Sequence, residues 1–483
     1  MPETFRNLIN GEWRAARDGE TYEDINPADT RDVVGAFAAS GPADVSDAFA
    51  AAEAAFPAWA EMPAPRRGDI LFRAAEILLA RADRIGAEMA REEGKTLPEA
   101  RAEVVRAAQI LRYFGGEAAR LTGETVPSDR PGVFAFTFRR PLGPLALITP
   151  WNFPIAIPAW KTAPALACGN TVVLKPAALT PLTALRLVEA VQEAGAPAGV
   201  LNLVTGPASR SGEALIADPR LRAVSFTGSC GTGAGLRDRC AGRGVRAQLE
   251  MGGKNPTIVL RDADLAEAAD IVAGAAFHST GQKCTATSRV IVEKPILAAF
   301  TEALVERTRR LKVGPGLTPG VDMGPCVDER QMRTVLDYIE IGRKEGARLL
   351  CGGRRLTGEE HRHGFFVEPT VFGDVTSAMR IAREEIFGPV LAVMEAADLD
   401  EAIRLANGVE FGLSASLISR DLPSALRYVR RIEAGVIMVN LPSAGVEYQL
   451  PFGGVKASST GHREQGSAAI DFFTELCTVY VRG

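Results

Sequence analysis

The 483-residue sequence lacks the features that mark several large classes of protein. No stretch reaches the roughly 18 uninterrupted apolar residues that a membrane-spanning helix needs. The N-terminus has no basic segment followed by an apolar one, so we expect no secretory leader. Positive charge is not in excess, because 55 Lys and Arg face 59 Asp and Glu, for a net charge of −4. We therefore expect neither a membrane partner nor a nucleic-acid partner.

The spacing of the cysteines indicates neither disulfide bonds nor a metal site. The seven cysteines include no C-x-x-C motif, and His361 and His363 lie near Cys351 without a second close Cys or His. A zinc pattern is therefore incomplete, and the sequence predicts no metal site. An odd number of thiols without a disulfide pattern is typical of a reducing compartment, so we expect free thiols and a cytoplasmic location.

Composition and periodicity predict an α/β protein. Hydrophobic residues make up 46% of the chain and charged residues 24%, as in ordinary globular domains. Apolar residues recur at helical spacing through most of 44–121. Beyond that, short apolar strands such as 145–150 and 171–176 alternate with helical segments such as 157–169. This alternation is typical of parallel, doubly wound sheets.

The periodicity predicts two such α/β units, which together fill the chain, and a strand-like C-terminus at 471–483 beyond them. A terminal strand with a free edge often pairs with another chain, so we expect this strand to pair with a partner chain.

Cys284 lies in a polar, glycine-containing segment that follows a long helix. Its neighbours Gln282, Lys283 and Thr285 indicate an accessible thiol, and Lys283 together with a helix N-terminus is expected to favour the thiolate. The alternative is a small buried apolar residue, which suits Cys168 in its apolar helix better. Cys284 is therefore a candidate nucleophile.

Two further polar residues stand at the ends of strand-like runs. Glu250 precedes a glycine pair, which suits a mobile general base, although an ordinary exposed Glu is the alternative. Asn152 lies between Trp151 and Phe153. Its amide N–H is suited to a developing oxyanion, although a turn-forming Asn is the alternative.

A cofactor site is indicated by strand ends and glycines. Only nine of the 55 basic residues are Lys, and Lys175 ends an apolar strand. Strand carboxyl ends face the ligand crevice of an open α/β sheet, so Lys175 is expected to meet a ribose hydroxyl or a phosphate. Residues 224–239 are predicted to form a strand, a glycine-rich turn and a helix, which suits phosphate at a helix N-terminus. Glu385 and Phe387 precede another strand-like run.

In this order, these segments resemble the aldehyde dehydrogenase superfamily along nearly the whole chain. The spacing between Glu250 and Cys284 is also similar to that of the family. The matching stretches are PWNFP at 150–154, KP at 175–176, FTGS at 226–229, EMGG at 250–253, GQKC at 281–284, EIFGP at 385–389 and PFGGVK at 451–456.

The resemblance implies an NAD(P)-dependent oxidoreductase that converts an aldehyde to a carboxylic acid. The Cys284 thiolate would attack the aldehyde carbon. Asn152 and the Cys284 backbone N–H would hold the oxyanion, and the thiohemiacetal would give hydride to the nicotinamide. Glu250 would then activate the water that hydrolyses the thioester.

The resemblance also implies two interleaved domains and a small β oligomerisation arm. Residues 1–118 and 141–251 would form a Rossmann-like cofactor-binding domain, residues 252–455 the catalytic domain, and residues 119–140 and 467–483 the arm. Lys175 and Glu385 would hold ribose groups, and Phe387 would flank the nicotinamide. The other implied cofactor positions are Thr149, Pro150, Trp151, Ala178, Gly228, Ser229 and Gly233. Many NAD-preferring relatives have Glu where this chain has Ala178. A carboxylate there would repel a 2′-phosphate, so we expect NADP to be preferred, with NAD as the alternative.

A resemblance to one branch of the superfamily narrows the range of aldehydes expected as the substrate. Residues 282–289, 443–447 and 462–466 look like the α-ketoglutarate semialdehyde (2,5-dioxovalerate) dehydrogenases. Lys283, Arg289 and Arg463 are candidates for binding a distal carboxylate. The family positions implied to line the aldehyde site are Phe153, Ile157, Trp160, Lys283, Thr285, Val446 and Phe452. This largely apolar lining also suits other aldehydes, such as succinate semialdehyde or benzaldehyde, or a broad specificity.

Three other functions are weighed against this one. A branch that passes the thioester to coenzyme A often lacks the hydrolytic Glu, whereas Glu250 is present. A non-catalytic protein of this fold is disfavoured by Cys284, Glu250 and Asn152, and a cysteine hydrolase by the cofactor motifs. The family resemblance implies a homodimer or homotetramer joined through the C-terminal strand, with a small-molecule aldehyde as the substrate.

Overall fold

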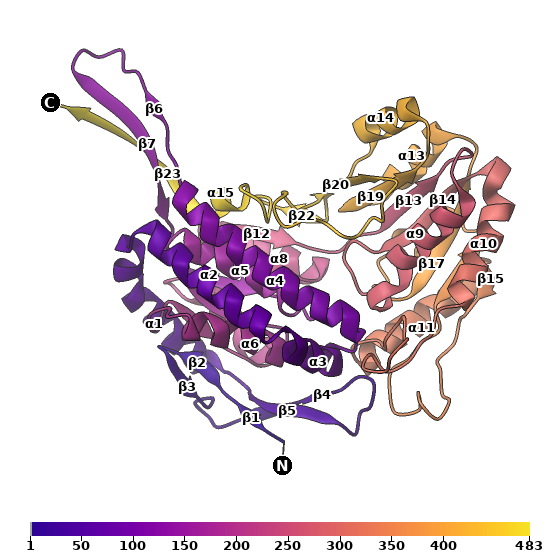
Figure 1. Ribbon diagram of the computed structural model, residues 1–483, viewed down its shortest axis with the longest axis horizontal. Helices are drawn as coiled ribbons and strands as arrows, with labels where there is room; N and C mark the ends of the chain where they lie inside the picture. The colour runs from indigo at the N-terminus through magenta and orange to yellow at the C-terminus, as the bar shows by residue number, and fades with distance from the viewer. Residues whose placement is uncertain (1) are drawn as a thin grey trace.

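The computed structural model describes residues 2–483 as two α/β lobes and a projecting β arm (Figure 1). The first lobe contains an eight-stranded sheet in the order β22-β12-β11-β8-β9-β10-β2-β3. Five central strands are parallel: β8 (Pro144–Ile148), β9 (Thr171–Lys175), β10 (Leu201–Leu203), β11 (Ala223–Thr227) and β12 (Arg246–Glu250). The antiparallel edge strands are β2 (Asn7–Ile9), β3 (Glu12–Arg14) and β22 (Ser459–Thr460).

Helices surround the first sheet, and its central strands are therefore buried on both faces. Every residue of β9 is buried, as the apolar run from Thr171 to Lys175 predicts. Pro181 begins helix α6 (Pro181–Glu193), and Gly195, at φ +95°, follows its end. The helices are α1 (Pro42–Glu61), α2 (Ala64–Ala80), α3 (Ala82–Glu93), α4 (Leu97–Glu117), α5 (Ala156–Ala167), α6 (Pro181–Glu193), α7 (Ala208–Ala217) and α8 (Cys230–Gly242). A small N-terminal sheet contains β1 (Thr4–Phe5), β5 (Val33–Ala38) and β4 (Thr21–Ile25).

The second lobe repeats this architecture with a seven-stranded sheet. Its order is β15 (Arg348–Cys351), β16 (Thr370–Gly373), β17 (Val390–Ala396), β14 (Thr287–Glu293), β13 (Asn255–Val259), β19 (Ser414–Ile418) and β20 (Val436–Val439). Only β15 is antiparallel to its neighbour. The covering helices are α9 (Leu265–Phe277), α10 (Leu297–Arg309), α11 (Glu329–Lys344), α12 (Arg380–Arg383), α13 (Leu399–Asn407) and α14 (Leu422–Arg431). Two doubly wound sheets confirm the predicted fold class.

The arm is a three-stranded antiparallel sheet that projects away from both lobes (Figure 1). β23 (Thr474–Arg482) pairs along its whole length with β7 (Val133–Pro141), and β6 (Thr125–Val126) completes the sheet. Residues 467–473, expected in the arm, contain helix α15 (Ala469–Phe473), whose Phe472 and Phe473 lie in the core of the first lobe. Within residues 2–483 no helix is long and apolar enough to cross a membrane.

The helix α15 is expected to hold the base of the arm to the first lobe through Phe472, which is fully buried. A Phe472→Ala substitution removes this contact and leaves a cavity, at a cost of about 3–5 kcal/mol. We expect a clearly lower Tm by differential scanning fluorimetry. The matched control is Phe72→Ala, since Phe72 is 40% exposed. An equal shift for both variants would contradict this role of α15.

Candidate active site

Polar side chains of the first lobe stand where its parallel strands end. The chain reverses direction across the sheet between β8 and β11, and ligands of doubly wound sheets bind beyond the strand carboxyl ends at such a point. Asn152 follows β8, Lys175 ends β9, Ser229 follows β11 and Glu250 ends β12. The sequence order thus brings the predicted residues of this lobe to one sheet edge.

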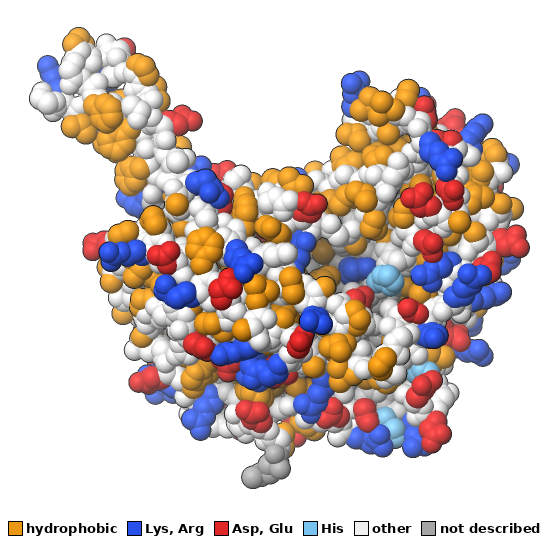
Figure 2. All heavy atoms as spheres, in the orientation of Figure 1, with side chains coloured by type: hydrophobic (Ala, Val, Ile, Leu, Met, Phe, Trp, Pro, Cys, Tyr) orange, Lys and Arg blue, Asp and Glu red, His pale blue; other side chains and the backbone are white. Residues whose placement is uncertain are grey.

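The second lobe supplies the facing groups from loops at the amino ends of its strands. Cys284 precedes β14, and Glu385 and Phe387 precede β17. Two contacts join the two edges: Asn152 Nδ2 donates to Gln282 O at 2.9 Å, and the Trp151 and Phe387 rings meet edge to face at 5.3 Å. In the segment between β12 and β13, Gly253 N donates to Glu385 Oε1 at 2.9 Å. The molecular surface is hollowed between the lobes (Figure 2).

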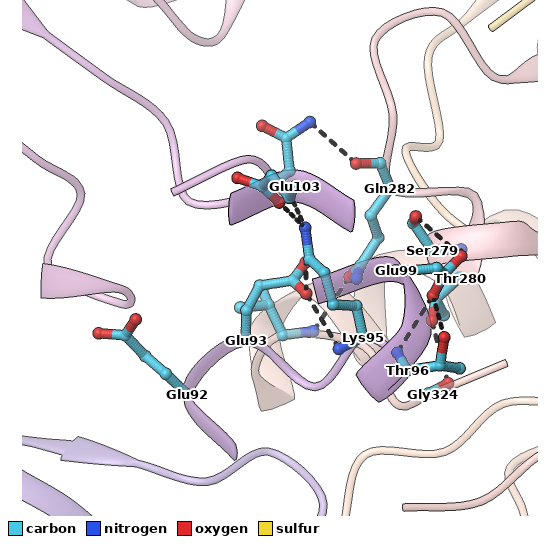
Figure 3. Close-up of polar contacts among 12 residues, drawn as sticks. Glu92, Glu93, Lys95, Thr96, Glu99, Glu103, Ser279, Thr280, Gln282 and Gly324 are labelled. Carbon is cyan, nitrogen blue, oxygen red and sulfur yellow. Dashed lines mark hydrogen bonds and ion pairs between the residues drawn. The ribbon is translucent and has the colours of Figure 1, made fainter. Parts of the chain in front are cut away.

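A buried ion pair fixes the segment that carries Asn152. Lys95 Nζ lies 2.6 Å from Glu103 Oε2 and donates to Asn152 O at 2.7 Å. Glu103 Oε1 accepts from the backbone N–H groups of Ile155 and Ala156, both at 3.1 Å. Figure 3 shows Lys95 with Glu93 and Glu103 on either side. This cluster was not predicted, although a scarce Lys beside several acids is a signal visible in the sequence.

Glu103 lies in α4, and the same helix also holds the segment that precedes Cys284. Glu99 Oε1 accepts from Ser279 N at 2.8 Å, while Glu99 Oε2 accepts from the Thr96 hydroxyl (Figure 3). Ser279 and Thr280 both have left-handed backbone conformations, at φ +54° and +58°. Such conformations cost energy in residues other than Gly and persist only where neighbouring contacts impose them. Glu99 and the Thr280 Oγ1 bond to Gly324 O supply those contacts.

Cys284 is a half-buried free thiol in a crowded loop. Its carbonyl accepts from Asn255 Nδ2 at 2.7 Å, and a Cβ at Gly253 would lie only 2.9 Å from that carbonyl oxygen. Burial raises the pKa of Cys284 to about 12, and the carboxylates of Glu385 and Glu250 act in the same direction. The expectation that Lys283 and a helix N-terminus favour the thiolate was therefore wrong for the free protein.

Glu250 is buried, which excludes the alternative of an ordinary exposed Glu. Oε2 accepts from the Ser459 hydroxyl at 2.5 Å, and Oε1 is buried without a hydrogen-bond partner. Burial raises the pKa of Glu250 well above its usual value, and the nearby Glu464 raises it further. Glu464 itself is paired with buried Lys161, and neither residue was singled out from the sequence.

The first lobe has unsatisfied polar groups that fit a dinucleotide. Lys175 Nζ donates only to Pro176 O, at 2.9 Å, and burial lowers the pKa of this amine to about 8. Thr149 Oγ1 is buried without a partner. Ser229 is exposed at the N-terminus of α8, and the half-buried Gly228 precedes it. A cation with one neutral acceptor suits ribose hydroxyls or a phosphate, and a helix N-terminus suits a phosphate.

The other implied cofactor positions surround these groups. Thr149 N donates to Lys175 O at 3.2 Å, so the loop with Thr149 and Pro150 lies beside the lysine. Ala178 is partly exposed in the loop between β9 and α6 and carries no charge. Gly233 is buried in the first turns of α8, where an added Cβ would meet the Met251 side chain.

The residues proposed to line the aldehyde site are mostly apolar and gather around α5. Ile157 and Trp160 are buried on this helix, and the Trp160 and Phe452 rings lie 5.7 Å apart. Lys95 Nζ lies 4.5 Å from the centre of the Phe153 ring. Val446 is half-buried in an irregular loop. Thr285 is buried and its carbonyl accepts from Ser443 Oγ at 2.7 Å.

The three basic residues considered for a distal carboxylate have other partners. Arg289 is fully buried and donates to the carbonyls of Lys254, Leu405 and Ala406, so its candidacy was wrong. Arg463 donates to Gly454 O. Lys283 Nζ lies 3.4 Å from Gly274 O in α9, and burial lowers its pKa to about 8.

Comparisons with known proteins place this arrangement in a family. The profile described as "Aldehyde dehydrogenase family" matches residues 13–479. An "Alpha-ketoglutaric semialdehyde dehydrogenase" of Bacillus subtilis is 48% identical over 479 residues, covering 99% of this chain and 98% of the relative. A "2,5-dioxopentanoate dehydrogenase" of Saccharolobus solfataricus is 47% identical over 465 residues, covering 96% of each chain.

A solved structure gives the same result. The crystal structure of an NAD-dependent aldehyde dehydrogenase from Sinorhizobium meliloti superposes with a TM-score of 0.97 at 38% identity, covering 100% of this chain and 95% of that one. The chain belongs to the aldehyde dehydrogenase family, as its motifs predicted. It is therefore an oxidoreductase that acts on small aldehydes with NAD(P).

The raised pKa of Cys284 predicts slow alkylation of the free enzyme. Iodoacetamide reacts with the thiolate, so the rate at Cys284 should rise about tenfold per pH unit from pH 7 to 9.5. Peptide mass spectrometry distinguishes Cys284 from the other six cysteines, and Cys284→Ser gives the background. A rate that levels off below pH 8.5 would show that the thiolate is favoured instead.

Proposed function

We propose that this protein oxidises α-ketoglutarate semialdehyde to 2-oxoglutarate through a covalent thioester at Cys284. The observation that carries the reaction is the meeting of three groups from the two lobes. Asn152 is linked to the loop of Cys284 by the bond from its Nδ2 to Gln282 O. Glu250 is linked to the same loop through residues 250–255, because Asn255 Nδ2 donates to Cys284 O. The names of the similar enzymes support the choice of substrate.

In the first half of the reaction, Cys284 Sγ bonds to the aldehyde carbon as the thiol proton leaves to water. Asn152 Nδ2 exchanges its bond to Gln282 O for one to the aldehyde oxygen, and the Cys284 N–H supplies a second donor. The hydride of this carbon would be transferred to NAD(P)+, which supplies the acceptor when bound. Lys175 and Glu385 would hold the ribose groups of the cofactor, and the Trp151 and Phe387 rings pack against each other between the lobes.

In the second half, Glu250 removes a proton from the water that attacks the thioester. Its raised pKa makes the ionised Glu250 carboxylate a stronger base than an exposed Glu. The Oε1 atom has no partner to give up, so it can accept the proton of a water molecule directly. The carboxylic acid is then released and the thiol of Cys284 is restored.

A Glu250→Gln substitution is expected to separate the two halves. The first should still yield one equivalent of reduced cofactor per active site, whereas steady-state turnover should fall about 10²- to 10⁴-fold because hydrolysis lacks its base. Rapid mixing with absorbance detection measures both, and Cys284→Ser should lose the burst as well. If Glu250→Gln turns over at the wild-type rate, Glu250 is not the base.

One feature of the structure also supports a second class of substrate. Trp160, Phe452 and Ile157 form an apolar lining, which also suits an aromatic or aliphatic aldehyde. An aldehyde panel decides between them: α-ketoglutarate semialdehyde should give a kcat/KM at least about tenfold above those of succinate semialdehyde and benzaldehyde. Equal efficiencies would indicate a broad-specificity enzyme.

NADP is the proposed preferred cofactor. Ala178 leaves the loop after β9 without a carboxylate, and the buried amine of Lys175 is free to attract a 2′-phosphate. An Ala178→Glu substitution should lower kcat/KM for NADP at least about tenfold, equal to about 1.4 kcal/mol, through like-charge repulsion. The value for NAD on the same variant is the control. Wild-type efficiency at least tenfold better with NAD would overturn the preference.

The arm supports a homodimer or homotetramer. Phe134, Leu476 and Tyr480 are 56%, 59% and 63% exposed on it, and large exposed apolar groups mark interaction surfaces. Strand β20 ends the second sheet with all four residues only half-buried, so its edge is free to pair with another chain. The seven free thiols support a cytoplasmic location.

A further inference from the structure

Arg106 lies in α4, which packs against α5, the helix with Ile157 and Trp160 of the proposed aldehyde lining. It follows Glu103 by three residues, so the two side chains leave the helix on the same face. Glu103 accepts from the N–H groups of Ile155 and Ala156, immediately after Asn152 and Phe153. Arg106 therefore lies about one helical turn from the segment that carries the proposed oxyanion donor.

A second segment encloses Arg106 from the other side. Its guanidinium lies 5.9 Å from the centre of the Tyr448 ring, and Tyr113 of α4 packs edge to face on the same ring at 5.9 Å. Tyr448 is held by the bond from Gly466 N to its carbonyl, at 3.0 Å. The loop continues to Phe452, whose ring contacts Trp160. Arg106 is thus placed between the two segments that supply the proposed aldehyde lining.

The guanidinium of Arg106 is incompletely bonded. Nη2 is buried and has no hydrogen-bond partner. An arginine side chain stays protonated in proteins, and a buried charge without a partner is costly. Glu103 does not neutralise it, because its oxygens are occupied by Lys95 and two backbone N–H groups. Burial lowers the pKa of Arg106, and the nearby carboxylate of Glu447 acts in the opposite direction. The two side chains do not form an ion pair.

The other basic groups near the site are already saturated or directed elsewhere. Lys95 is bonded to Glu103 and Asn152 O, Arg289 to three carbonyls, and Arg463 to Gly454 O. Lys283 extends toward α9. Unlike these four groups, Arg106 keeps a buried donor, Nη2, without a partner for an incoming anion.

We propose that Arg106 binds the distal carboxylate of the substrate, so that the enzyme selects short aldehydes with a carboxylate at the far end. This inference rests on the proposed function. The guanidinium would take a carboxylate in a charge-assisted, two-bond geometry while the face of Tyr448 steadies it. Within an apolar lining, this single contact explains how a small, charged aldehyde is held with its carbonyl directed to Cys284.

The test compares carboxylated and uncharged aldehydes in the same variant holoenzyme. Arg106→Met keeps much of the apolar volume and removes the charge. We expect kcat/KM for α-ketoglutarate semialdehyde and succinate semialdehyde to fall about 10²-fold, mainly through KM. The values for benzaldehyde and butyraldehyde should stay within about twofold. Arg106→Lys keeps the charge without the paired donors, so its loss should be intermediate.

The matched control is Arg112→Met on the same helix. Arg112 is exposed and paired with Glu76 at 2.6 Å, so its removal should leave both aldehyde classes unchanged. Glutarate provides a readout without turnover: it should protect the wild-type and Arg112→Met enzymes against heat and protect Arg106→Met less. Equal losses for both aldehyde classes would show a structural role only, and unchanged kinetics would also overturn the proposal.

The panel separates this inference from the proposed function. If α-ketoglutarate semialdehyde is a poor substrate but Arg106→Met still impairs succinate semialdehyde selectively, the carboxylate contact holds and the named substrate is wrong. If α-ketoglutarate semialdehyde is oxidised efficiently and Arg106→Met has no selective effect, the substrate holds and Arg106 does not bind it.

Discussion

The buried ion pair of Lys95 and Glu103 is the contact on which the geometry of the site depends. Both side chains are almost completely shielded from water, where a charge without a partner is strongly unfavourable. Each is saturated by the segment that follows β8: Lys95 by the Asn152 carbonyl, Glu103 by the N–H groups of Ile155 and Ala156. Removing either partner would strand a charge and release the loop that presents the Asn152 amide.

Burial also sets the resting protonation of the site. It raises the pKa of Cys284 to about 12 and that of Glu385 to about 7, and it raises that of Glu250 as well. Desolvation disfavours the charged form of each of these groups, so they can share a small volume that fully ionised groups could not. The thiol of the free protein is thus weakly nucleophilic, and in the proposed reaction the oxyanion donors supply the stabilisation when the aldehyde carbon is attacked.

Much of this arrangement could be predicted from strand ends, and the rest could not. The apolar runs before Asn152, Lys175 and Glu250 indicated parallel strands whose carboxyl ends share an edge. β19, rich in serine, gave no such signal, although all of it is buried. The predicted direction of the Cys284 pKa shift was wrong, because the sequence shows neighbouring residues such as Lys283 but not the desolvation of the thiol. Contacts such as Glu99 with Ser279 join residues that only the packed lobes bring together.

One face of α4 carries residues that we propose for both the reaction and its selectivity. Glu99, Glu103 and Arg106 follow each other at intervals of four and three residues, which keeps them on one side of the helix. Glu99 fixes the loop before Cys284, Glu103 fixes the segment with Asn152, and Arg106 keeps a free donor beside Tyr448. A site set on a rigid helix holds its distances better than one set on loops alone. The distance from the proposed carboxylate contact to the reacting carbon is then fixed by the helix itself, so the length of the aldehyde becomes part of what the enzyme recognises.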